Sequence, residues 1–461
     1  MKSFKVLAAL ICAVLLLSVS AFASGKGESD SAGKEKVIWA AYGYLDEGKA
    51  DRIKADFEAK YPQYEVEYVD LGSTDYLVRL DTALAGGERY DMCLSMSASD
   101  YVPRAKEGLY VPIEKYLTDA GYDLEDAFGS GIKASYINKK LYGLPYTKGG
   151  FYVFYNKDMF DAAGIPYPTN DWTWAEFEQI AKKLTKDGVY GANVHLTWGY
   201  DIETLPAKMA GWTPFANGDI YKANMTDKRL KDALEMWYRM QRVDKSAIQL
   251  STFKTEQIGS RVPFAKGQAA MLLSNWWSAT WMMNAKFGTA DGKNMMNFKI
   301  GVVNIPRPNT KVPNNLNSTE LDWYFAVPTT AKNPKGGALL AMFMITEEWP
   351  KLGTLSSYRH EDLNVFMKKF VTYKAKDGTL HTMTAYDAEF VKTVMGGWTE
   401  PITAYYKTDA RANPEGLAQA NEIYGQEREL YYNGEQDIEK TIASMQKRLQ
   451  AELDAQKKAK R

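Results

Sequence analysis

Aromatic and polar side chains stand just past the ends of the predicted strands, where a ligand could reach them. Tyr42 and Tyr44 follow the first strand, and Ser97 and Asp100 follow the third. One face of a pyranose ring is C–H and packs flat on an aromatic ring, while its hydroxyl edge hydrogen-bonds to carboxylates and amides. These residue types favour a sugar as ligand. A second set of candidates follows or flanks the later strands: Trp198, Tyr200, Asn275, Trp276, Trp277, Glu320, Asp322 and Trp323.

Each candidate also has a structural explanation. A tryptophan at a strand end packs in a core more often than it holds a ligand, and Asp100, Glu320 and Asp322 would serve equally as helix caps or solvated turns. Tyr146 fits either a hinge or a ligand contact. The sequence has no G-x-S-x-G, H-E-x-x-H or P-loop motif, and its three histidines lack metal-ligand spacing. We therefore expect no enzyme activity, no metal and no cofactor.

The elements that must hold the first candidates alternate between strand and helix. A helix between the first two strands has Ala50, Ile53 and Phe57 on one face, and the next helix, 75–85, is expected to turn its three leucines inward. This β-α-β-α-β order with short links predicts parallel strands and right-handed crossovers. The three strands are predicted at 37–42, 64–69 and 90–96.

The stretch 141–185 organises the rest of the chain. Its turn, YGLPY, leads into FYVFYN (151–156), in which both alternating sets are apolar or aromatic, so we expect a strand buried in the middle of a helix-covered sheet. A short helix then stops at Gly164 and Pro166. Thr173 and Glu176 form a T-x-x-E capping box at the start of the next helix. Trp172 and Trp174 lie at that helix start, where packing is their expected role.

Elements predicted after 185 continue this alternation. We expect Gly267 to end a helix over 256–266, and the buried run 269–273 to be a strand. A helix over 333–346 begins with an Asn-Pro cap, and Ile438, Ile442, Met445 and Leu449 stripe the last helix. The remaining predictions are strands at 190–197, 299–305 and 321–327 and a helix at 227–243.

The order of turn, strand, short helix, AGI-P and TW-x-EF resembles one family, the extracellular solute-binding proteins of carbohydrate ABC importers, which includes maltose-binding protein. The pieces L-x-x-AL-x-GG-x-x-YD, EGLYVPIEKYL and PFAKGQAAM…W are similar to the same family. Where the family usually has Pro-Asp before the third strand, this chain has Tyr90-Asp91. The resemblance places Trp276 and Trp277 in the ligand cleft and adds Trp398, in a late loop, to the candidates.

The resemblance implies an α/β protein with a two-lobed, periplasmic-binding-protein-like fold of type II, in which each lobe is a mostly parallel sheet flanked by helices. It implies a first lobe of residues 37–146 and 308–350, and a second lobe of 147–307 and 351–461. The chain would cross between them near 143–149, 305–308 and 349–357. A monomer that delivers a carbohydrate to the transmembrane subunits of an ABC permease is the expected function.

The N-terminus has the pattern of a cleaved signal peptide. Lys2 and Lys5 precede an apolar run at 7–19, and the A-x-A site ends at Ala23. We expect a periplasmic protein with residues 1–23 removed and a flexible leader at 24–36. Ile11 stands where a lipobox needs a small residue, which disfavours lipid attachment at Cys12. The other cysteine, Cys93, is then alone, so we expect no intramolecular disulfide and a buried thiol.

Composition excludes several partners. The chain has 461 residues, with 57 basic and 57 acidic side chains. Loss of the two signal-peptide lysines leaves 55 against 57, so no basic field for nucleic acid exists. Two alternative functions stay open. The first is a secreted enzyme that acts on glycosides, since glycosidases also have carboxylates beside aromatic rings. The second is binding of another solute such as glycerol phosphate, since Arg104, Arg261 and Arg307 have no assigned role.

Overall fold

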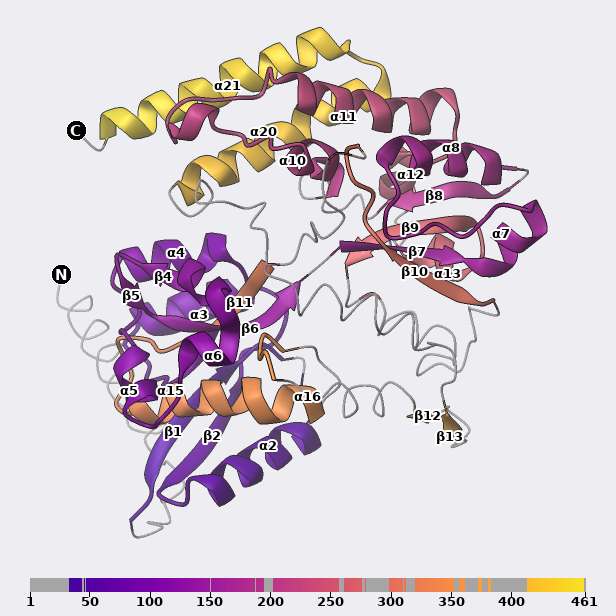
Figure 1. Ribbon diagram of the computed structural model, residues 1–461. Coiled ribbons are helices and arrows are strands. Elements are labelled where there is room, and N and C mark those ends of the chain that lie inside the picture. Colours follow the sequence, from indigo (N-terminus) through magenta and orange to yellow (C-terminus); the bar gives the residue numbers. More distant parts are fainter. Residues whose placement is uncertain are drawn as a thin grey trace, which may run out of the picture.

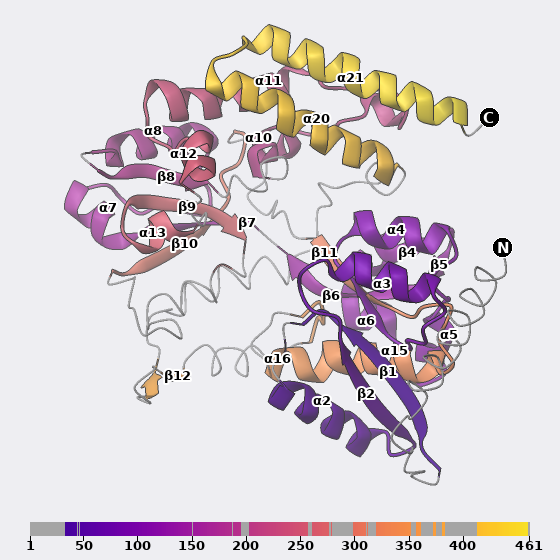
Figure 2. The same cartoon turned by 180° about the vertical axis from the view of Figure 1, so that it is seen from behind.

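The computed structural model shows two lobes. One lobe holds mostly N-terminal residues (lower left in Figure 1), and the other holds the middle and the end of the chain (across the top and the right). Figure 2 shows the same lobes from behind. The residues that the structure describes are 33–43, 45, 47–149, 151–186, 188–194, 202–256, 261–275, 278, 298–309, 311, 320–351, 356–360, 372–374, 380–382 and 413–459.

The first lobe begins with a parallel strand pair. β1 (Glu35–Ala41) pairs with β2 (Tyr64–Asp70) along the whole length of both strands. The helix between them, α2 (Glu47–Lys60), buries Ala50, Ile53 and Phe57, as predicted. The strand begins at Glu35, so the expected leader is two residues too long: the backbone N–H of Glu35 already hydrogen-bonds to the carbonyl oxygen of Gln63.

The next helix, α3 (Tyr76–Ala85), turns its three leucines toward the first-lobe core, as predicted. Leu80 is fully buried, and Leu77 and Leu84 are half-buried and pack against the same core. Tyr76 is also fully buried. Residues four apart lie one above the other on a helix, so the Tyr76 ring and Leu80 form the centre of the inward face.

A second sheet completes the first lobe. β11 (Glu320–Ala326) lies between β3 (Cys93–Ser95) and β6 (Gly143–Gly149) and is antiparallel to both. The helix α4 (Ala98–Lys106) packs against β3 and β11, and α15 (Pro334–Phe343) packs against β1, β6 and β11. Cys93 lies in β3 as a buried, free cysteine, as predicted, and burial raises the pKa of its thiol to about 12.

The second lobe is built on one sheet with the strand order β10-β7-β9-β8. Its interior strand β7 (Phe151–Asn156) is buried at every position except Phe151, as the doubly apolar pattern predicted. The predicted capping box is present at the start of α8 (Trp174–Leu184), where Thr173 accepts from the backbone N–H of Glu176. The other strands are β8 (Tyr190–Val194), β9 (Ala269–Asn275) and β10 (Ile300–Asn304).

Helices cover this sheet and extend to the C-terminus. One prediction here was wrong, because the helix expected over 256–266 does not match the helices found. The helix α12 (Leu250–Thr255) ends before Glu256, which is its C-cap residue. A second, short helix, α13 (Val262–Ala265), begins after Arg261 and has a proline in its first turn. Further second-lobe helices are α7 (Lys157–Ala163), α10 (Leu205–Met209), α11 (Lys228–Tyr238), α20 (Pro414–Asn433) and α21 (Ile438–Ala459).

The remaining elements are short. They are α5 (Glu114–Thr118), α6 (Leu124–Phe128), α16 (Trp349–Lys351), the 3-10 helices η1 (Gly129–Ser135) and η3 (Ala216–Gly218), the π-helices η4 (Arg239–Val243) and η5 (Met344–Glu348), and the strands β4 (Tyr136–Ile137), β5 (Lys140–Leu141), β12 (Thr372–Lys374) and β13 (Leu380–Thr382). Among the described residues, no helix is both long and apolar enough to cross a membrane.

The sheets are mixed, which corrects the expectation of mostly parallel strands. β1 with β2 and β8 with β9 are parallel, but β7 is antiparallel to both its neighbours and β11 is antiparallel to both of its own. Parallel neighbours need a crossover connection. β6 belongs to the sheet of the first lobe and β7, which comes next in the chain, belongs to the sheet of the second. β11 is the strand by which the chain returns to the first lobe.

Each lobe has its own hydrophobic core. The first core contains Val37, Phe57, Leu141 and Phe343 among others, and the second contains Phe160, Phe177, Trp237 and Leu453 among others. No residue belongs to both clusters, so the described residues bury their apolar surface in two separate bodies.

Segment 356–360 lies against the first lobe, although the expected boundary gave residues after 350 to the second. Ser356 bridges to Thr147, and the backbone N–H of Arg359 donates to the carbonyl oxygen of Ala127 at 2.7 Å. His360 Nε2 lies 3.0 Å from an Asp126 carboxylate oxygen. These partners satisfy the backbone of the segment, so it belongs with the first lobe.

Two glycines give a matched test of the packing at Asp91. A Cβ on Gly337 in α15 would come 1.7 Å from the backbone oxygen of Asp91, whereas a Cβ on Gly425 in α20 would meet nothing within 4 Å. We expect Gly337→Ala to lower the free energy of unfolding by about 1–3 kcal/mol or more through overpacking. Gly425→Ala should raise it by about 0.5–1 kcal/mol. Urea unfolding of both variants measures this, and equal effects would contradict the close contact.

Candidate functional site

Three backbone segments lie side by side where the chain passes between lobes. β11 pairs with β6 from Glu320 opposite Gly149 to Ala326 opposite Gly143. On the other side, the backbone N–H of Ser357 donates to the Tyr146 carbonyl oxygen at 3.1 Å, and its hydroxyl donates to the carbonyl oxygen of Pro145. The hinge region is therefore a short hydrogen-bonded ribbon.

Aromatic rings from this ribbon meet the end of β1. Trp323 on β11 makes edge-to-face contacts with Tyr42 and Tyr146, with ring centroids 5.8 and 5.6 Å apart. Tyr146 also stacks on Phe325 at 4.9 Å and meets Trp349 edge-on at 5.4 Å. Tyr42 and Trp323 are half-buried, so each keeps part of its surface exposed. Three of the sequence-predicted ligand residues thus come together as one cluster, Tyr42–Trp323–Tyr146.

Trp323 has a strained backbone. Its φ is +52°, in the left-handed region that bulky residues rarely adopt. The flanking residues stay paired with β6, Asp322 opposite Thr147 and Tyr324 opposite Pro145, so the ladder holds the strain from both sides. Strain of about 1–3 kcal/mol of this kind collects at ligand sites and hinges. The conformation therefore makes Trp323 a candidate functional residue.

The loop after β1 fits closely against the loop after β2. Gly43 has φ +66°, and a Cβ there would come 2.8 Å from an Asp70 carboxylate oxygen and from the backbone of Gly72. Tyr76, missed by the sequence analysis, packs edge-on to Tyr42 with ring centroids 5.5 Å apart. Its place in the first turn of a helix beside a strand end is the signal that could have found it. These contacts fix the direction in which Tyr42 leaves the strand.

Ser97 and Asp100 form the N-terminal cap of α4. The Ser97 hydroxyl donates to the Asp100 carboxylate at 2.9 Å and accepts from the Asp100 backbone N–H. Burial raises the pKa of the Asp100 carboxyl, and the hydrogen bond from Ser97 opposes that shift. Their structural role as a cap is thus present, and the same carboxylate faces the end of β3, where a hydroxyl ligand could reach it.

The second lobe contributes a buried polar atom beside the crossing. Asn275, the last residue of β9, pairs with Phe151, the first residue of β7. Its side chain is 8% exposed, and its Oδ1 accepts no hydrogen bond from any residue that the structure describes. An amide oxygen buried without a donor costs about 1–3 kcal/mol. A ligand hydroxyl at this position would remove that cost.

A buried ion pair lies in the second lobe at Glu203. Glu203 is fully buried and binds the guanidinium of Arg428 on α20. Its carboxylate also accepts from the Tyr424 hydroxyl at 3.1 Å, and its backbone oxygen accepts from the Trp237 indole at 2.8 Å. Burial raises the pKa of the Glu203 carboxyl, and Arg428 opposes that shift. The pair therefore ties the residues just before α10 to α20.

Several candidates lie outside the residues that the structure describes: Tyr44, Trp198, Tyr200, Trp276, Trp277 and Trp398. For Glu320 and Asp322 the structure describes the backbone, which places them on β11 opposite Gly149 and Thr147. The described part of the site therefore consists of the aromatic cluster, the Ser97–Asp100 cap and Asn275.

The architecture is that of the two-lobed solute-binding proteins of type II, and comparisons agree. The chain matches the model of the bacterial extracellular solute-binding protein family over residues 42–349. It belongs to this family.

Solved structures with this fold cover nearly the whole chain. The structure of a sugar transporter from Rhizobium etli, in an open conformation, has a TM-score of 0.71 to this chain at 22% identity. The match covers 90% of this chain and 99% of the Rhizobium chain. The sugar-binding protein MalE of Xanthomonas citri has a TM-score of 0.70 at 18% identity, covering 92% and 98%. At these identities the likeness shows the fold.

Curated relatives match over a shorter stretch. A putative binding protein of Brucella abortus is 26% identical over 190 residues, 41% of this chain and 43% of its own. The sn-glycerol-3-phosphate-binding periplasmic protein UgpB of Agrobacterium fabrum is also 26% identical over 190 residues, 41% of this chain and 40% of its own. The aligned region thus spans about two fifths of these relatives.

The buried pair gives a test with a pH signature. Arg428→Met should lower the free energy of unfolding by about 3–5 kcal/mol, because it leaves the Glu203 carboxylate buried without its cation. The folded-state pKa of that carboxyl then rises further above its unfolded value, so stability should fall as pH increases through that window. Thermal unfolding at pH 5 and pH 8 should therefore show the larger loss at pH 8.

The double variant Glu203→Leu/Arg428→Met is the control. It removes both charges, so it should recover much of the lost stability and abolish the extra pH dependence. A single variant that loses less than about 1 kcal/mol, or loses the same at both pH values, would contradict the pairing.

Proposed function

We propose that this protein is the extracytoplasmic solute-binding component of an ABC importer and that its ligand is a sugar or oligosaccharide. The observation that carries the proposal is the Tyr42–Trp323–Tyr146 cluster beside the hinge ribbon, in which the Tyr42 and Trp323 rings are only half-buried and Trp323 has a strained backbone. Aromatic rings beside an unsatisfied amide such as Asn275 suit a ligand with apolar faces and a hydroxyl edge. Membership of the solute-binding family supports it.

Binding would work by closure of the two lobes. A ligand held by Tyr42 and Trp323 on one side and by Asn275 on the other gains contacts only when both lobes approach it. It therefore favours the closed population by its difference in affinity for the two forms. The closed form would then be recognised by the permease.

The lobes in this proposal follow the two hydrophobic cores. The first consists of residues 37–146 and 308–350 together with 356–360, and the second of 147–307 and the rest of the C-terminal part. Removal of a signal peptide at Ala23 and delivery to the periplasm also belong to the proposal. Mass spectrometry of the exported protein tests them, since an acylated Cys12 at the N-terminus would refute cleavage after Ala23.

A phosphate-bearing ligand is the second candidate, because UgpB proteins are among the relatives. Two of the three arginines without an assigned role bind carboxylates within the protein: Arg104 holds Asp81 at 2.6 Å, and Arg307 holds Asp171 at 2.8 Å. These arginines are already neutralised, which favours an uncharged ligand. For the third arginine, Arg261, burial lowers the pKa of the guanidinium to about 10.

A ligand screen by thermal shift tests the function. A ligand that binds only the folded state raises its apparent stability, by an amount that grows with the ratio of ligand concentration to Kd. Mono- and oligosaccharides form one arm and sn-glycerol 3-phosphate the other. Stabilisation by the phosphate alone would overturn the sugar proposal. Cleavage products in the same oligosaccharide mixtures would identify an enzyme and refute a purely binding role.

Substitution at Trp323 separates ligand contact from packing. Trp323→Ala should weaken sugar binding about 5- to 150-fold, using about 1–3 kcal/mol for stacking on one ring, with little change in melting temperature. Trp172→Ala is the matched control, because Trp172 is buried and its indole donates to the Asn304 carbonyl oxygen at 2.7 Å. That control should lose about 3–5 kcal/mol of stability.

The same paired measurement applies to Trp276, Trp277 and Trp398, which the family resemblance makes candidates for sugar stacking in the ligand cleft. Titration calorimetry and thermal unfolding of each alanine variant give both quantities. If all three variants bind sugar normally, or lose stability in proportion to binding, these tryptophans are structural and do not stack on the ligand.

A further inference from the structure

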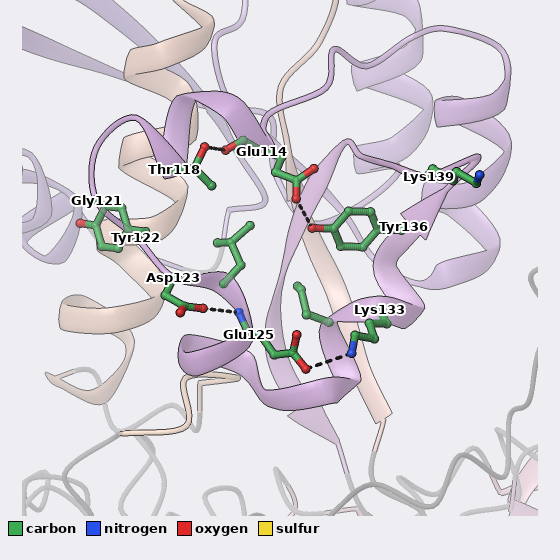
Figure 3. A pocket seen from close by; sticks show the side chains of 11 residues that line it. Glu114, Thr118, Gly121, Tyr122, Asp123, Glu125, Lys133, Tyr136 and Lys139 are labelled. Carbon is green, nitrogen blue, oxygen red and sulfur yellow. Dashed lines mark hydrogen bonds and ion pairs between the residues drawn. The ribbon is translucent and has the colours of Figure 1, made fainter.

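A groove opens on the first lobe, and none of its lining residues belongs to the strands that cross between lobes. Its volume is about 880 Å³, within the range of ligand sites. It lies among α5, α6, η1 and the β4–β5 turn (Figure 3). The lining residues are Glu114, Thr118, Gly121, Tyr122, Asp123, Leu124, Glu125, Ile132, Lys133, Tyr136 and Lys139.

Two tyrosines stand on opposite sides of this groove in Figure 3. The Tyr136 hydroxyl donates to the Glu114 carboxylate at 2.5 Å, and the Tyr122 hydroxyl lies 2.9 Å from that of Tyr61. Because each phenol group is held, each ring has a fixed orientation and remains half-buried. Rings fixed in this way offer a surface for stacking at little cost in entropy.

The floor of the groove is apolar and its rim is polar. Leu124 and Ile132 are 6% and 3% exposed. On the rim, Glu125 pairs with Lys133 at 2.9 Å, and Asp123 accepts two backbone N–H groups at the start of α6. Acceptors and donors therefore alternate, and the carboxylates are already partly neutralised.

These features disfavour a metal ion and an extended peptide. Among the residues that the structure describes, no three carboxylate, histidine or cysteine side chains converge to hold a metal. A peptide added as a strand needs a row of unpaired backbone groups, and the neighbouring strands β4 and β5 are only two residues long. A neutral, polyhydroxylated molecule uses all that the groove offers: rings, an apolar floor and alternating polar groups.

We propose that the groove is a second oligosaccharide-binding site, separate from the site between the lobes. A glycan chain would lie between Tyr122 and Tyr136, with its hydroxyl groups on Glu114, Thr118 and the Lys133–Glu125 pair. The groove is open, so a chain longer than the groove can extend beyond both ends. The proposal stands on the groove itself and needs no ligand between the lobes.

Calorimetric titration with maltohexaose and cellohexaose tests the proposal. Tyr136→Ala removes one ring, and Thr118→Arg places a long side chain in the groove from an exposed position that the fold does not depend on. Each should weaken groove binding of at least one hexasaccharide about 5- to 150-fold, the effect expected for one stacked ring. Tyr167→Ala, which changes an exposed tyrosine on the second lobe, is the matched control and should have no effect.

The same titrations separate this proposal from the proposed function. Trp323→Ala should weaken binding between the lobes and leave groove binding intact, whereas Thr118→Arg should weaken groove binding and leave binding between the lobes intact. Each hexasaccharide is titrated to about 10 mM, which is about tenfold above a Kd of 1 mM. The groove proposal is overturned if, up to that concentration, Thr118→Arg abolishes the binding of neither hexasaccharide. It is also overturned if hexalysine displaces the sugar, which would make the groove a site for cationic peptides.

Discussion

The continuous run from β6 into β7 is the constraint on which this structure depends. One run of chain supplies a strand to each lobe, so its register fixes both sheets at once. In their separate sheets, β6 is antiparallel to β11, and β7 is antiparallel to β9 and β10. The strain at Trp323 follows from the same constraint, since β11 stays paired with β6 on either side of that residue.

Much of this arrangement could be predicted from sequence because the signals are local. FYVFYN has no face suited to water, so its position inside a sheet follows from composition alone. The T-x-x-E capping box and the alternating strand and helix order are likewise short-range patterns, and they located α8, β1, β2 and β7 within a few residues. Tyr42, Tyr146 and Trp323 were predicted individually, at strand ends or at the crossing.

What could not be predicted depends on contacts distant in the chain. The backbone of Trp323 is set by pairing with residues almost two hundred positions earlier, and no local pattern signals a left-handed tryptophan. The inward face of α3 also carries the buried Tyr76 ring, which leucine spacing alone did not reveal. Strand direction failed for a similar reason: the β-α-β pattern describes the first two strands and says nothing of strands that enter from another lobe.

The Asp91 carboxylate has a consequence for how the chain acquires its structure. It accepts from the backbone N–H of Ile38 at 2.8 Å and from those of Lys332 and Asn333 at 2.9 and 2.7 Å. The first lobe therefore cannot close its sheet until a segment some 240 residues later has been made, and the second core likewise waits for α20 and α21. Such distant pairing slows folding, because the entropy of long loops must be lost before the contacts form. A growing chain of this protein can therefore complete its first core only after Trp349 has been made, and its second only after Leu453.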